Sequence, residues 1–250
     1  MIQHMLSIIV PLFNEEENIL PIYNELKKVL YTLHLSYEII FIDDGSSDNT
    51  YQLLRNLKLK DDKIIIVKFI RNFGQSAALA AGFNIASGDI AITIDGDLQY
   101  DPRDIALFLE KIQQNVDVVC GWRQGRRSSL LIRRAPSLLA NFIGVFIFGL
   151  KTHDFSCSFR AYKKKFYKKL YLADGLHRFI PILAKFEGLA AMEVKVVCKP
   201  RVSGMSKYSF SRFPIVIKDA IFLKITELVF NKSCDHLFRE TNFIIDAIIV

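Results

Sequence analysis

Short apolar runs alternate with longer amphipathic segments through the first half of the chain. Each run has the length of a buried strand, and the segments between the runs carry apolar residues at helical spacing. Such alternation predicts an α/β fold with a mainly parallel central sheet and helices on both of its faces. We expect strands at residues 6–12, 38–42, 64–70, 90–94 and 116–120, and helices at residues 15–33, after Asp48, at 75–86 and at 102–114.

The pattern changes after the fifth expected strand. No Asp or Glu occurs between Val118 and His153, and a cluster of arginines precedes the apolar run at residues 138–150. A second apolar run, at residues 213–230, carries scattered charges. Neither run reaches the roughly 20 apolar residues of a spanning helix, so we expect both to lie along a surface or in the core. The clustered arginines are Arg123, Arg126, Arg127, Arg133 and Arg134.

Composition narrows the classes of partner. The formal net charge of +7 suits nucleic acid, an acidic membrane or phosphorylated substrates. Nucleic acid is disfavoured because the arginine cluster lacks interleaved aromatic residues and no recognition-helix pattern is present. The four cysteines are widely spaced, which indicates reduced thiols in a cytosolic protein rather than a disulfide or zinc framework. The apolar run at residues 6–10 is short and lacks a preceding basic region, so we expect no signal peptide.

Two aspartates stand two residues apart where the fourth expected strand ends, in the sequence Asp95-Gly96-Asp97-Leu98-Gln99. Ligands of parallel sheets bind beyond the carboxyl ends of the strands. A hard divalent cation takes oxygen ligands together with waters and substrate phosphates. The spacing therefore points to a cation that offsets the charge of a bound diphosphate. A solvated turn with two ordinary aspartates is the alternative.

Other strand ends carry weaker signals. Asp44 ends the second strand, where a carboxylate can hold a base or a ribose, while Asp48 is equally explained as a helix cap. Arg123 follows the fifth strand, and a guanidinium can clamp a phosphate with two hydrogen bonds. Residues 201–208 form a basic, glycine-containing cluster that suits either a phosphate or a solvated loop. The lysines at residues 163–169 suit a solvated helix face or an anionic lipid surface.

Taken together and in this order, the motifs resemble the inverting family 2 glycosyltransferases of the GT-A fold. The likeness is strongest for polyprenyl-phosphate sugar transferases of the dolichol-phosphate mannose synthase and bacterial polyprenyl-phosphate glucosyltransferase type. It runs from Leu6 to about Phe213. Its motifs are Pro11-Leu12-Phe13-Asn14-Glu15, Asp43-Asp44-Gly45-Ser46-Ser47-Asp48, Arg71-Asn72-Phe73-Gly74, Asp95-Gly96-Asp97-Leu98-Gln99, Gly121-Trp122-Arg123, Ser158-Phe159-Arg160, His177-Arg178-Phe179 and residues 201–208.

The resemblance implies a metal-dependent enzyme that uses Mg²⁺ or Mn²⁺ and transfers a hexose with inversion. It implies that Asp95, Asp97 and Arg123 carry catalysis, and that Asp97 and Gln99 hold the metal. The acceptor phosphate would meet Arg123, Arg133 and Ser137. The nucleotide sugar would be bound by Pro11, Phe13, Glu15, Ile42, Asp44, Asp95, Gly96, Asp97, Arg201 and Lys207.

The implied reaction needs little general-base help. A lipid monophosphate has a second pKa near ~6 and is largely anionic at neutral pH, so the enzyme's contribution is positioning and charge stabilisation. We therefore nominate no strong catalytic base. UDP-glucose and GDP-mannose are both open as the donor. A polyprenyl phosphate is the expected acceptor, with a soluble glycan or protein acceptor as one alternative and a non-catalytic module as another.

The resemblance also divides the chain. Residues 1–212 would form the GT-A catalytic domain, and residues 213–250 a membrane-proximal segment of amphipathic helices. We expect a peripheral protein on the cytoplasmic face of an anionic membrane. The sequence does not decide between a monomer and a homo-oligomer. Two features depart from the family. Ser158 stands where the family often has glycine. The chain also ends at Val250 without the two spanning helices of many bacterial members, which is expected either of a peripheral form or of a shortened chain.

Overall fold

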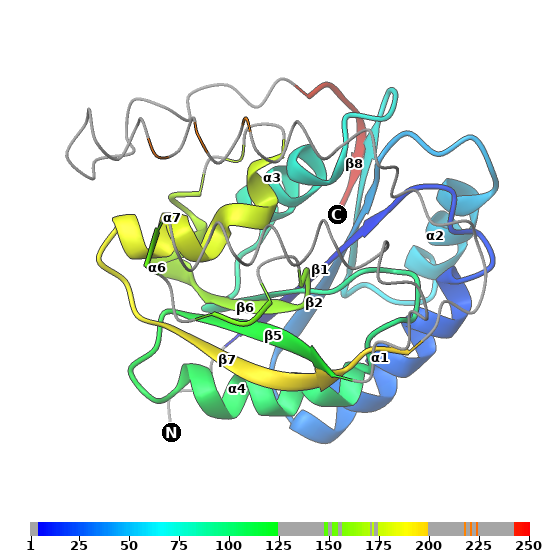
Figure 1. The fold of residues 1–250 in the computed structure, drawn as a ribbon. Coiled ribbons are helices and arrows are strands. Elements are labelled where there is room, and N and C mark those ends of the chain that lie inside the picture. Colours follow the sequence, from blue (N-terminus) through cyan, green and yellow to red (C-terminus); the bar gives the residue numbers. More distant parts are fainter. Residues whose placement is uncertain are drawn as a thin grey trace.

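The computed structural model describes residues 5–124, 148–149, 152–154, 157–170, 172, 175–199, 218, 221, 224 and 243–250. Its strands are β1 (Leu6–Leu12), β2 (Tyr37–Asp43), β3 (Ile64–Phe69), β4 (Ile90–Thr93), β5 (Val118–Gln124), β6 (Arg160–Lys163), β7 (Ala191–Val197) and β8 (Ile245–Ile249). These described strands form one eight-stranded sheet in the order β7-β5-β6-β4-β1-β2-β3-β8 (Figure 1). The fold class predicted from the sequence is confirmed.

Most strands of the sheet point the same way. β1 is parallel to β2 and β4, β2 is parallel to β3, and β7 is parallel to β5. β6 is antiparallel to β4 and β5, and β8 is antiparallel to β3. The carboxyl ends of β1 to β5 therefore meet along one edge of the sheet, which is where parallel sheets bind ligands.

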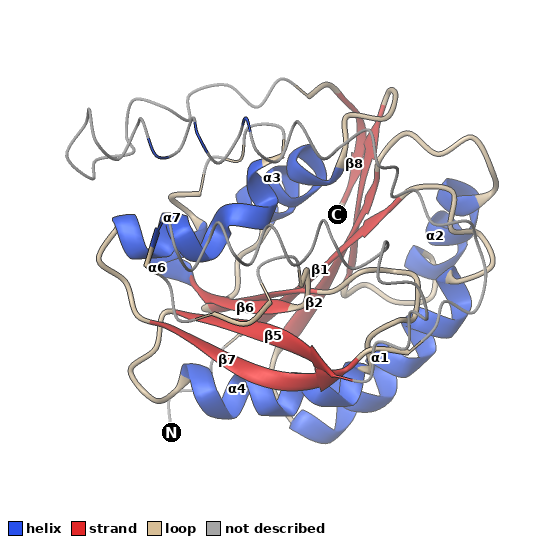
Figure 2. Cartoon of the chain, in the orientation of Figure 1, coloured by secondary structure: helices blue, strands red, loops and turns tan. Residues whose placement is uncertain are grey.

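Helices cover both faces of the sheet (Figure 2). The described helices are α1 (Ile19–Leu33), α2 (Thr50–Lys58), α3 (Gln75–Ile85), the 3-10 turn η1 (Pro102–Asp104), α4 (Ile105–Ile112), α6 (Lys164–Tyr167), the 3-10 turn η2 (Leu176–Phe179) and α7 (Ile180–Phe186). One hydrophobic cluster joins the sheet to α1, α2 and α4, and a second joins it to α3, α6 and α7. The sheet is thus buried on both faces, which explains its continuous apolar strands.

Residue periodicity decides which face each side chain covers. Ile8 and Val10 of β1 enter the cluster with α1, whereas Ile9 enters the cluster with α3, as alternation along a strand requires. Helix α3 is different, because every residue from Ser76 to Phe83 is buried. Small alanines along this helix let its whole circumference pack, which accounts for the alanine-rich segment in the sequence.

The C-terminal residues correct one expectation. The predicted helical segment at residues 213–250 is wrong over Ile245–Ile249, because these residues form strand β8 against β3. Their exposure alternates between intermediate and exposed, which is the period of a strand, and isoleucine favours that conformation. Lys218, Ile221 and Lys224 are helical, and the rest of residues 213–242 lies outside the described part of the chain. Within the described residues, no helix is long and apolar enough to cross a membrane.

The lysine cluster at residues 163–169 has structural partners. Lys164 and Lys168 donate their Nζ protons to the carbonyls of Ser87 (2.6 Å) and Asn84 (2.8 Å), near the C-terminal end of α3. Cations at a helix C-terminus are favourable there. Lys163 pairs with Ile90, the first residue of β4, so the cluster lies at the sheet edge opposite the carboxyl ends.

Gly45, which follows β2, lies against the backbone that follows β3. Its φ is +69°, and a Cβ atom added to it would stand 2.2 Å from the carbonyl carbon of Arg71. Gly188 has nearly the same φ, +68°, but a Cβ there would meet no atom within 4 Å. Both positions favour glycine for their backbone conformation, and only Gly45 also requires it for close contact.

Gly45→Ala is therefore expected to destabilise the fold more than Gly188→Ala. Both variants place alanine in the left-handed region at a cost of about 1 to 2 kcal/mol, but only the first forces two loops apart. Urea unfolding measures the free energy of unfolding of each variant. Equal losses in the two variants would show that the contact between Gly45 and Arg71 does not constrain the fold.

Candidate active site

The loops that follow β1 and β2 are bound to each other at the carboxyl edge. The backbone N–H of Asn14 donates to Ser46 Oγ (2.9 Å), and Asn14 Oδ1 accepts the N–H of Ser47 (2.8 Å). Asp48 accepts the N–H of Thr50 (3.0 Å), the first residue of α2, but the N-cap position itself is Asn49 and not Asp48 as expected. These contacts place the first two sequence motifs side by side.

Asp44 binds the loop that follows β3. Its carboxylate accepts hydrogen bonds from Asn72 Nδ2 (2.9 Å) and from the backbone N–H groups of Phe73 (2.7 Å) and Gly74 (2.9 Å). The residue is 5% exposed. Its carboxylate therefore fixes the Asn72–Gly74 backbone, a role that sequence reasoning missed, and its contact with a nucleoside remains a prediction.

The preceding residue, Asp43, is fully buried. Its Oδ1 accepts the N–H of Ser46 (2.9 Å), and its Oδ2 has no hydrogen-bond partner among the described residues. Burial raises the pKa of this carboxyl group, although the hydrogen bonds from Ser46 act in the opposite direction. Asp43 thus supports the turn after β2 from inside.

The other residues assigned to the nucleoside lie on β1 and β2 or in the loop that follows β1. Pro11 stands opposite Ile42 in the β1–β2 register, and Phe13 and Glu15 are partly exposed. Ile42 is fully buried in the cluster beneath α3, so its side chain packs in the core. Glu15 Oε2 accepts a hydrogen bond from Asn18 (2.6 Å), the residue before α1, which begins at Ile19 and not at the expected residue 15.

The carboxylate of Asp95 is held from two sides. Its Oδ1 accepts a hydrogen bond from Gln75 Nε2 (3.0 Å) at the first residue of α3, and its Oδ2 accepts one from Ser158 Oγ. Neither donor was predicted. Ser158 did stand out in the sequence as a departure from the family's glycine, and the structure places its hydroxyl on the Asp95 carboxylate.

Asp97 follows in a tight turn. It is 4% exposed, and its Oδ1 accepts the N–H of Gln99 (3.2 Å). Leu98 between them has φ +60°, a conformation that non-glycine residues adopt rarely and that is enriched at functional sites. A Cβ added to Gly96 would stand 2.3 Å from Leu12 Cδ2, so the motif is packed directly on the end of β1.

The donor set fits a divalent cation that is only partly bound by protein. No group of three or more His, Cys, Asp or Glu side chains converges within the described residues. Mg²⁺ and similar hard cations are held through one or two carboxylates together with substrate phosphates and waters. Asp95 and Asp97 supply two such carboxylates, so the described residues suit a metal that arrives with a diphosphate.

Arg123 is paired with Asp154, which sequence reasoning missed. Its Nε lies 2.6 Å from Asp154 Oδ2 and its Nη2 lies 2.7 Å from Oδ1, with the two side chains 11% and 9% exposed. Burial by itself lowers the pKa of Arg123, but the hydrogen bonds with Asp154 outweigh it, so that the pKa is raised. Contact between Arg123 and an acceptor phosphate stays a prediction.

Glu193 of β7 fixes the position of Asp154. Its Oε1 accepts the backbone N–H groups of His153 (2.8 Å) and Asp154 (3.1 Å), and its Oε2 lies 2.7 Å from His153 Nδ1. The ring of His153 also stacks on Trp122, with centroids 3.9 Å apart. The two strands β5 and β7 therefore hold the ion pair from both sides.

His177 contacts the start of α3 and the side chain of Arg160. Its Nδ1 lies 2.7 Å from Ser76 Oγ in the first turn of α3, and its carbonyl accepts a hydrogen bond from Arg160 Nη1 (2.7 Å). The remaining residues assigned from the sequence lie outside the described part of the chain, and their roles stay predictions. They are Arg133, Ser137, Arg201 and Lys207.

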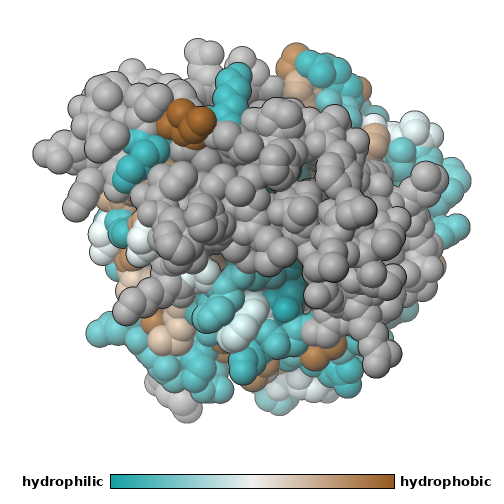
Figure 3. All heavy atoms as spheres, viewed as in Figure 1, coloured by the Kyte–Doolittle hydropathy of each residue, from teal (hydrophilic) through white to brown (hydrophobic). Residues whose placement is uncertain are grey.

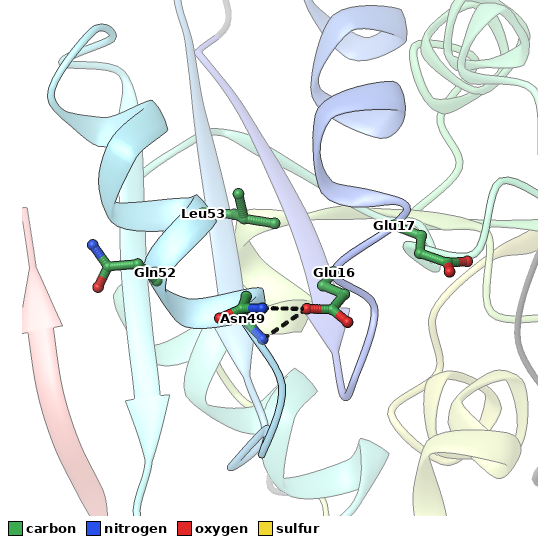
Figure 4. Close-up of a pocket in the computed structure, with 5 residues that line it drawn as sticks. All are labelled: Glu16, Glu17, Asn49, Gln52 and Leu53. Carbon is green, nitrogen blue, oxygen red and sulfur yellow. Dashed lines mark hydrogen bonds between the residues drawn. The ribbon is translucent and has the colours of Figure 1, made fainter.

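A pocket of about 400 Å³ lies between the start of α1 and α2, on the outer side of these loops. Glu16 and Asn49 face each other across it and are joined by two hydrogen bonds to Glu16 Oε2 (Figure 4). None of its lining residues was assigned to the donor, metal or acceptor. The described surface on the face seen in Figure 3 is mainly hydrophilic. We therefore place the candidate site at the carboxylates of the sheet edge and not in this pocket.

The family model described as Glycosyl transferase family 2 matches residues 7–171. The chain belongs to glycosyltransferase family 2. This match covers the motifs from the first strand to beyond Ser158.

Two relatives show the range of named activities in the family. The dodecaprenyl-phosphate galacturonate synthase of Rhizobium johnstonii is 36% identical over 220 residues, which is 86% of this chain and 65% of that protein. The undecaprenyl-phosphate 4-deoxy-4-formamido-L-arabinose transferase of Pseudomonas paraeruginosa is 34% identical over 218 residues, or 87% of this chain and 64% of that protein. The chain thus spans slightly less than two thirds of the length of these relatives.

A solved structure supports the fold. Glucosyl-3-phosphoglycerate synthase from Mycobacterium tuberculosis, in complex with Mn²⁺ and uridine-diphosphate-glucose, superposes with a TM-score of 0.64 at 18% identity. The match covers 90% of this chain and 78% of that one. The family 2 chain described here therefore has the GT-A fold.

Asp154→Ala is expected to lower the free energy of unfolding by about 3 to 5 kcal/mol, because it leaves the buried Arg123 guanidinium without its carboxylate. Asp246→Ala is the matched control, since it breaks the Lys68–Asp246 pair, in which Asp246 is 45% exposed. An exposed pair contributes at most about 1 kcal/mol. Urea unfolding of both variants tests the difference, and similar small losses would mean that Asp154 does not stabilise Arg123.

Proposed function

We propose that the chain is a metal-dependent inverting glycosyltransferase that moves a hexose from a nucleotide sugar to a polyprenyl phosphate. The observation that carries the proposal is the pair of carboxylates, Asp95 and Asp97, oriented at the carboxyl edge of a family 2 sheet. The names of the two relatives support a lipid-phosphate acceptor. The solved neighbour is a complex with Mn²⁺ and uridine-diphosphate-glucose, which supports a metal and a nucleotide-sugar donor.

In this mechanism the residues of the chain bind and orient the substrates. Asp97 and Gln99 would hold the cation, Asp95 would hold the donor, and the loops at Phe13 and Asp44 would hold the nucleoside. When bound, Mg²⁺ or Mn²⁺ would supply positive charge to offset that of the departing nucleoside diphosphate.

The acceptor phosphate supplies its own nucleophile. Its anionic oxygen attacks the anomeric carbon, the bond to the nucleoside diphosphate breaks, and the configuration inverts in this single displacement. Arg123, Arg133 and Ser137 place the phosphate for that attack. The Asp154 carboxylate holds Arg123 in one orientation through two hydrogen bonds, which limits the directions in which its guanidinium can act.

The acceptor and donor are tested by transfer assays. Purified chain is incubated with Mn²⁺ and UDP-glucose, GDP-mannose or a UDP-uronic acid, and with undecaprenyl phosphate in detergent or a soluble phosphorylated acceptor. Transfer of sugar into the lipid fraction supports the proposal. Transfer to the soluble acceptor alone would assign the chain to the alternative class of family 2 enzymes.

Asp97→Asn is expected to lower turnover by roughly 100-fold or more with little change in the melting temperature. The amide keeps the shape of the side chain but removes the charge, and a catalytic metal contributes several kcal/mol to charge stabilisation, where each 1.4 kcal/mol is tenfold in rate. Asp89→Asn makes the same change at the opposite end of β4 and is expected to keep turnover. Near-normal turnover by the Asp97 variant would remove this residue from the metal site.

We also infer that the protein binds the cytoplasmic face of an anionic membrane peripherally. Because the lysines of residues 163–169 lie at the sheet edge away from the candidate site, the arginines at residues 126 and 127 are the better candidates for lipid contact. Basic residues near an anionic surface contribute about 1 kcal/mol each.

Arg126→Gln with Arg127→Gln is expected to weaken binding to phosphatidylglycerol liposomes by roughly 30-fold, which corresponds to about 2 kcal/mol. Lys165→Gln with Lys169→Gln removes the same charge at the sheet edge away from the candidate site and is expected to change binding less. Flotation at low and high salt measures both, and salt should weaken the attraction. Retention of the wild type through a carbonate wash would contradict peripheral binding.

A further inference from the structure

The two groups that hold Asp95 are themselves fixed by neighbouring elements. Ser158 accepts a hydrogen bond from Thr93 Oγ1 (2.6 Å) through its backbone carbonyl and donates one to Asp95 Oδ2 through its hydroxyl. Thr93 is the last residue of β4, two positions before Asp95. Ser158 therefore spans the end of β4 with two hydrogen bonds and restrains the residue that carries the carboxylate.

Gln75 is restrained in a comparable way. It is the first residue of α3, and the backbone immediately before it is bound by Asp44 through the N–H groups of Phe73 and Gly74. The next residue, Ser76, contacts His177 on the other side of the helix start. The amide of Gln75 thus reaches Asp95 from a helix turn that is bound at both flanks.

The Gln75 amide and the Ser158 hydroxyl are uncharged donors to Asp95. A hydroxyl and a carboxamide remove rotational freedom from a carboxylate without cancelling its charge, whereas a lysine or arginine in either place would neutralise it. This combination suits a carboxylate that must face a cation and a diphosphate in one orientation, since partners in the outer shell of a metal site orient the groups that bind it.

We propose that Ser158 and Gln75 are positioning residues, which hold the Asp95 carboxylate in the orientation that receives the metal–nucleotide diphosphate. The inference rests on the proposed function and extends it to two residues outside the Asp95–Gln99 motif. The competing explanation is that the same hydrogen bonds only attach β6 and α3 to the sheet. In that case their loss changes stability and leaves metal–nucleotide binding as it was.

The test measures binding separately from turnover. Free Mn²⁺ is followed by electron paramagnetic resonance while it is titrated into the protein with UDP or with GDP, and melting temperatures are recorded without ligand. Ser158→Ala and Gln75→Ala are each expected to weaken Mn²⁺–nucleotide binding by roughly 10-fold or more, the lower end of the effect of outer-shell partners. In the transfer assay both are expected to lower kcat while the KM for the acceptor stays constant.

Two further variants separate positioning from packing. Ser158→Thr keeps the hydroxyl and is expected to retain most of the affinity. Ser87→Ala removes a serine hydroxyl that donates to Glu38 Oε1 (2.9 Å) at the opposite sheet edge, and is expected to bind Mn²⁺–nucleotide as the wild type does. The double variant Ser158→Ala with Gln75→Ala is expected to lose less than the product of the single losses, because both donors act on one carboxylate.

The outcomes distinguish this inference from the function on which it rests. Wild-type protein that binds Mn²⁺ with a nucleotide, together with alanine variants that bind equally well but melt earlier, would overturn the positioning role alone. Wild-type protein that binds neither Mn²⁺–UDP nor Mn²⁺–GDP would overturn the proposed function and the positioning role with it. Weaker Mn²⁺–nucleotide binding by both alanine variants, together with retained binding by Ser158→Thr and Ser87→Ala, would establish the positioning role.

Discussion

The carboxylate of Asp44 is the contact on which the arrangement of the carboxyl edge depends. It joins the end of β2 to the backbone after β3 and so determines where α3 begins. From that starting point Gln75 reaches Asp95, and Ser76 reaches His177. One buried carboxylate therefore influences groups from three separate parts of the chain, at residues 72–76, 95 and 177, and a shift of the α3 start would reach all of them.

The sheet is predictable from the sequence where both faces are buried and less so elsewhere. β1 to β4 are visible as apolar runs because helices cover them on both sides. β6 has a basic residue at each end, Arg160 and Lys163, and β7 alternates between exposed and buried positions, so neither has that signal. Strand β8 pairs with β3 across a long stretch of sequence, and nothing local in the chain identifies its partner.

The candidate site also contains some residues that the sequence identifies and others that only the fold brings together. Asp95 and Asp97 are recognisable because they flank a glycine at a strand end, a spacing that belongs to the motif by which the chain resembles its family. Their supports are not, since Ser158 stands 63 residues from Asp95 and a hydroxyl or an amide has no pattern of its own. The acid that pairs with Arg123 is Asp154, the first acidic residue after the long acid-free stretch, yet only the fold brings them together.

The pairing of β8 with β3 has a consequence for biosynthesis. Lys68 and Asp246, which form an ion pair across these strands, are separated by 178 residues. At about 5 to 20 residues per second, the ribosome needs roughly 10 to 35 seconds to add that length. During this time β3 presents an uncovered strand edge to other nascent chains, and a lysine on such an edge discourages intermolecular pairing. Lys68 thus limits intermolecular strand pairing before Asp246, its ion-pair partner, has been synthesised.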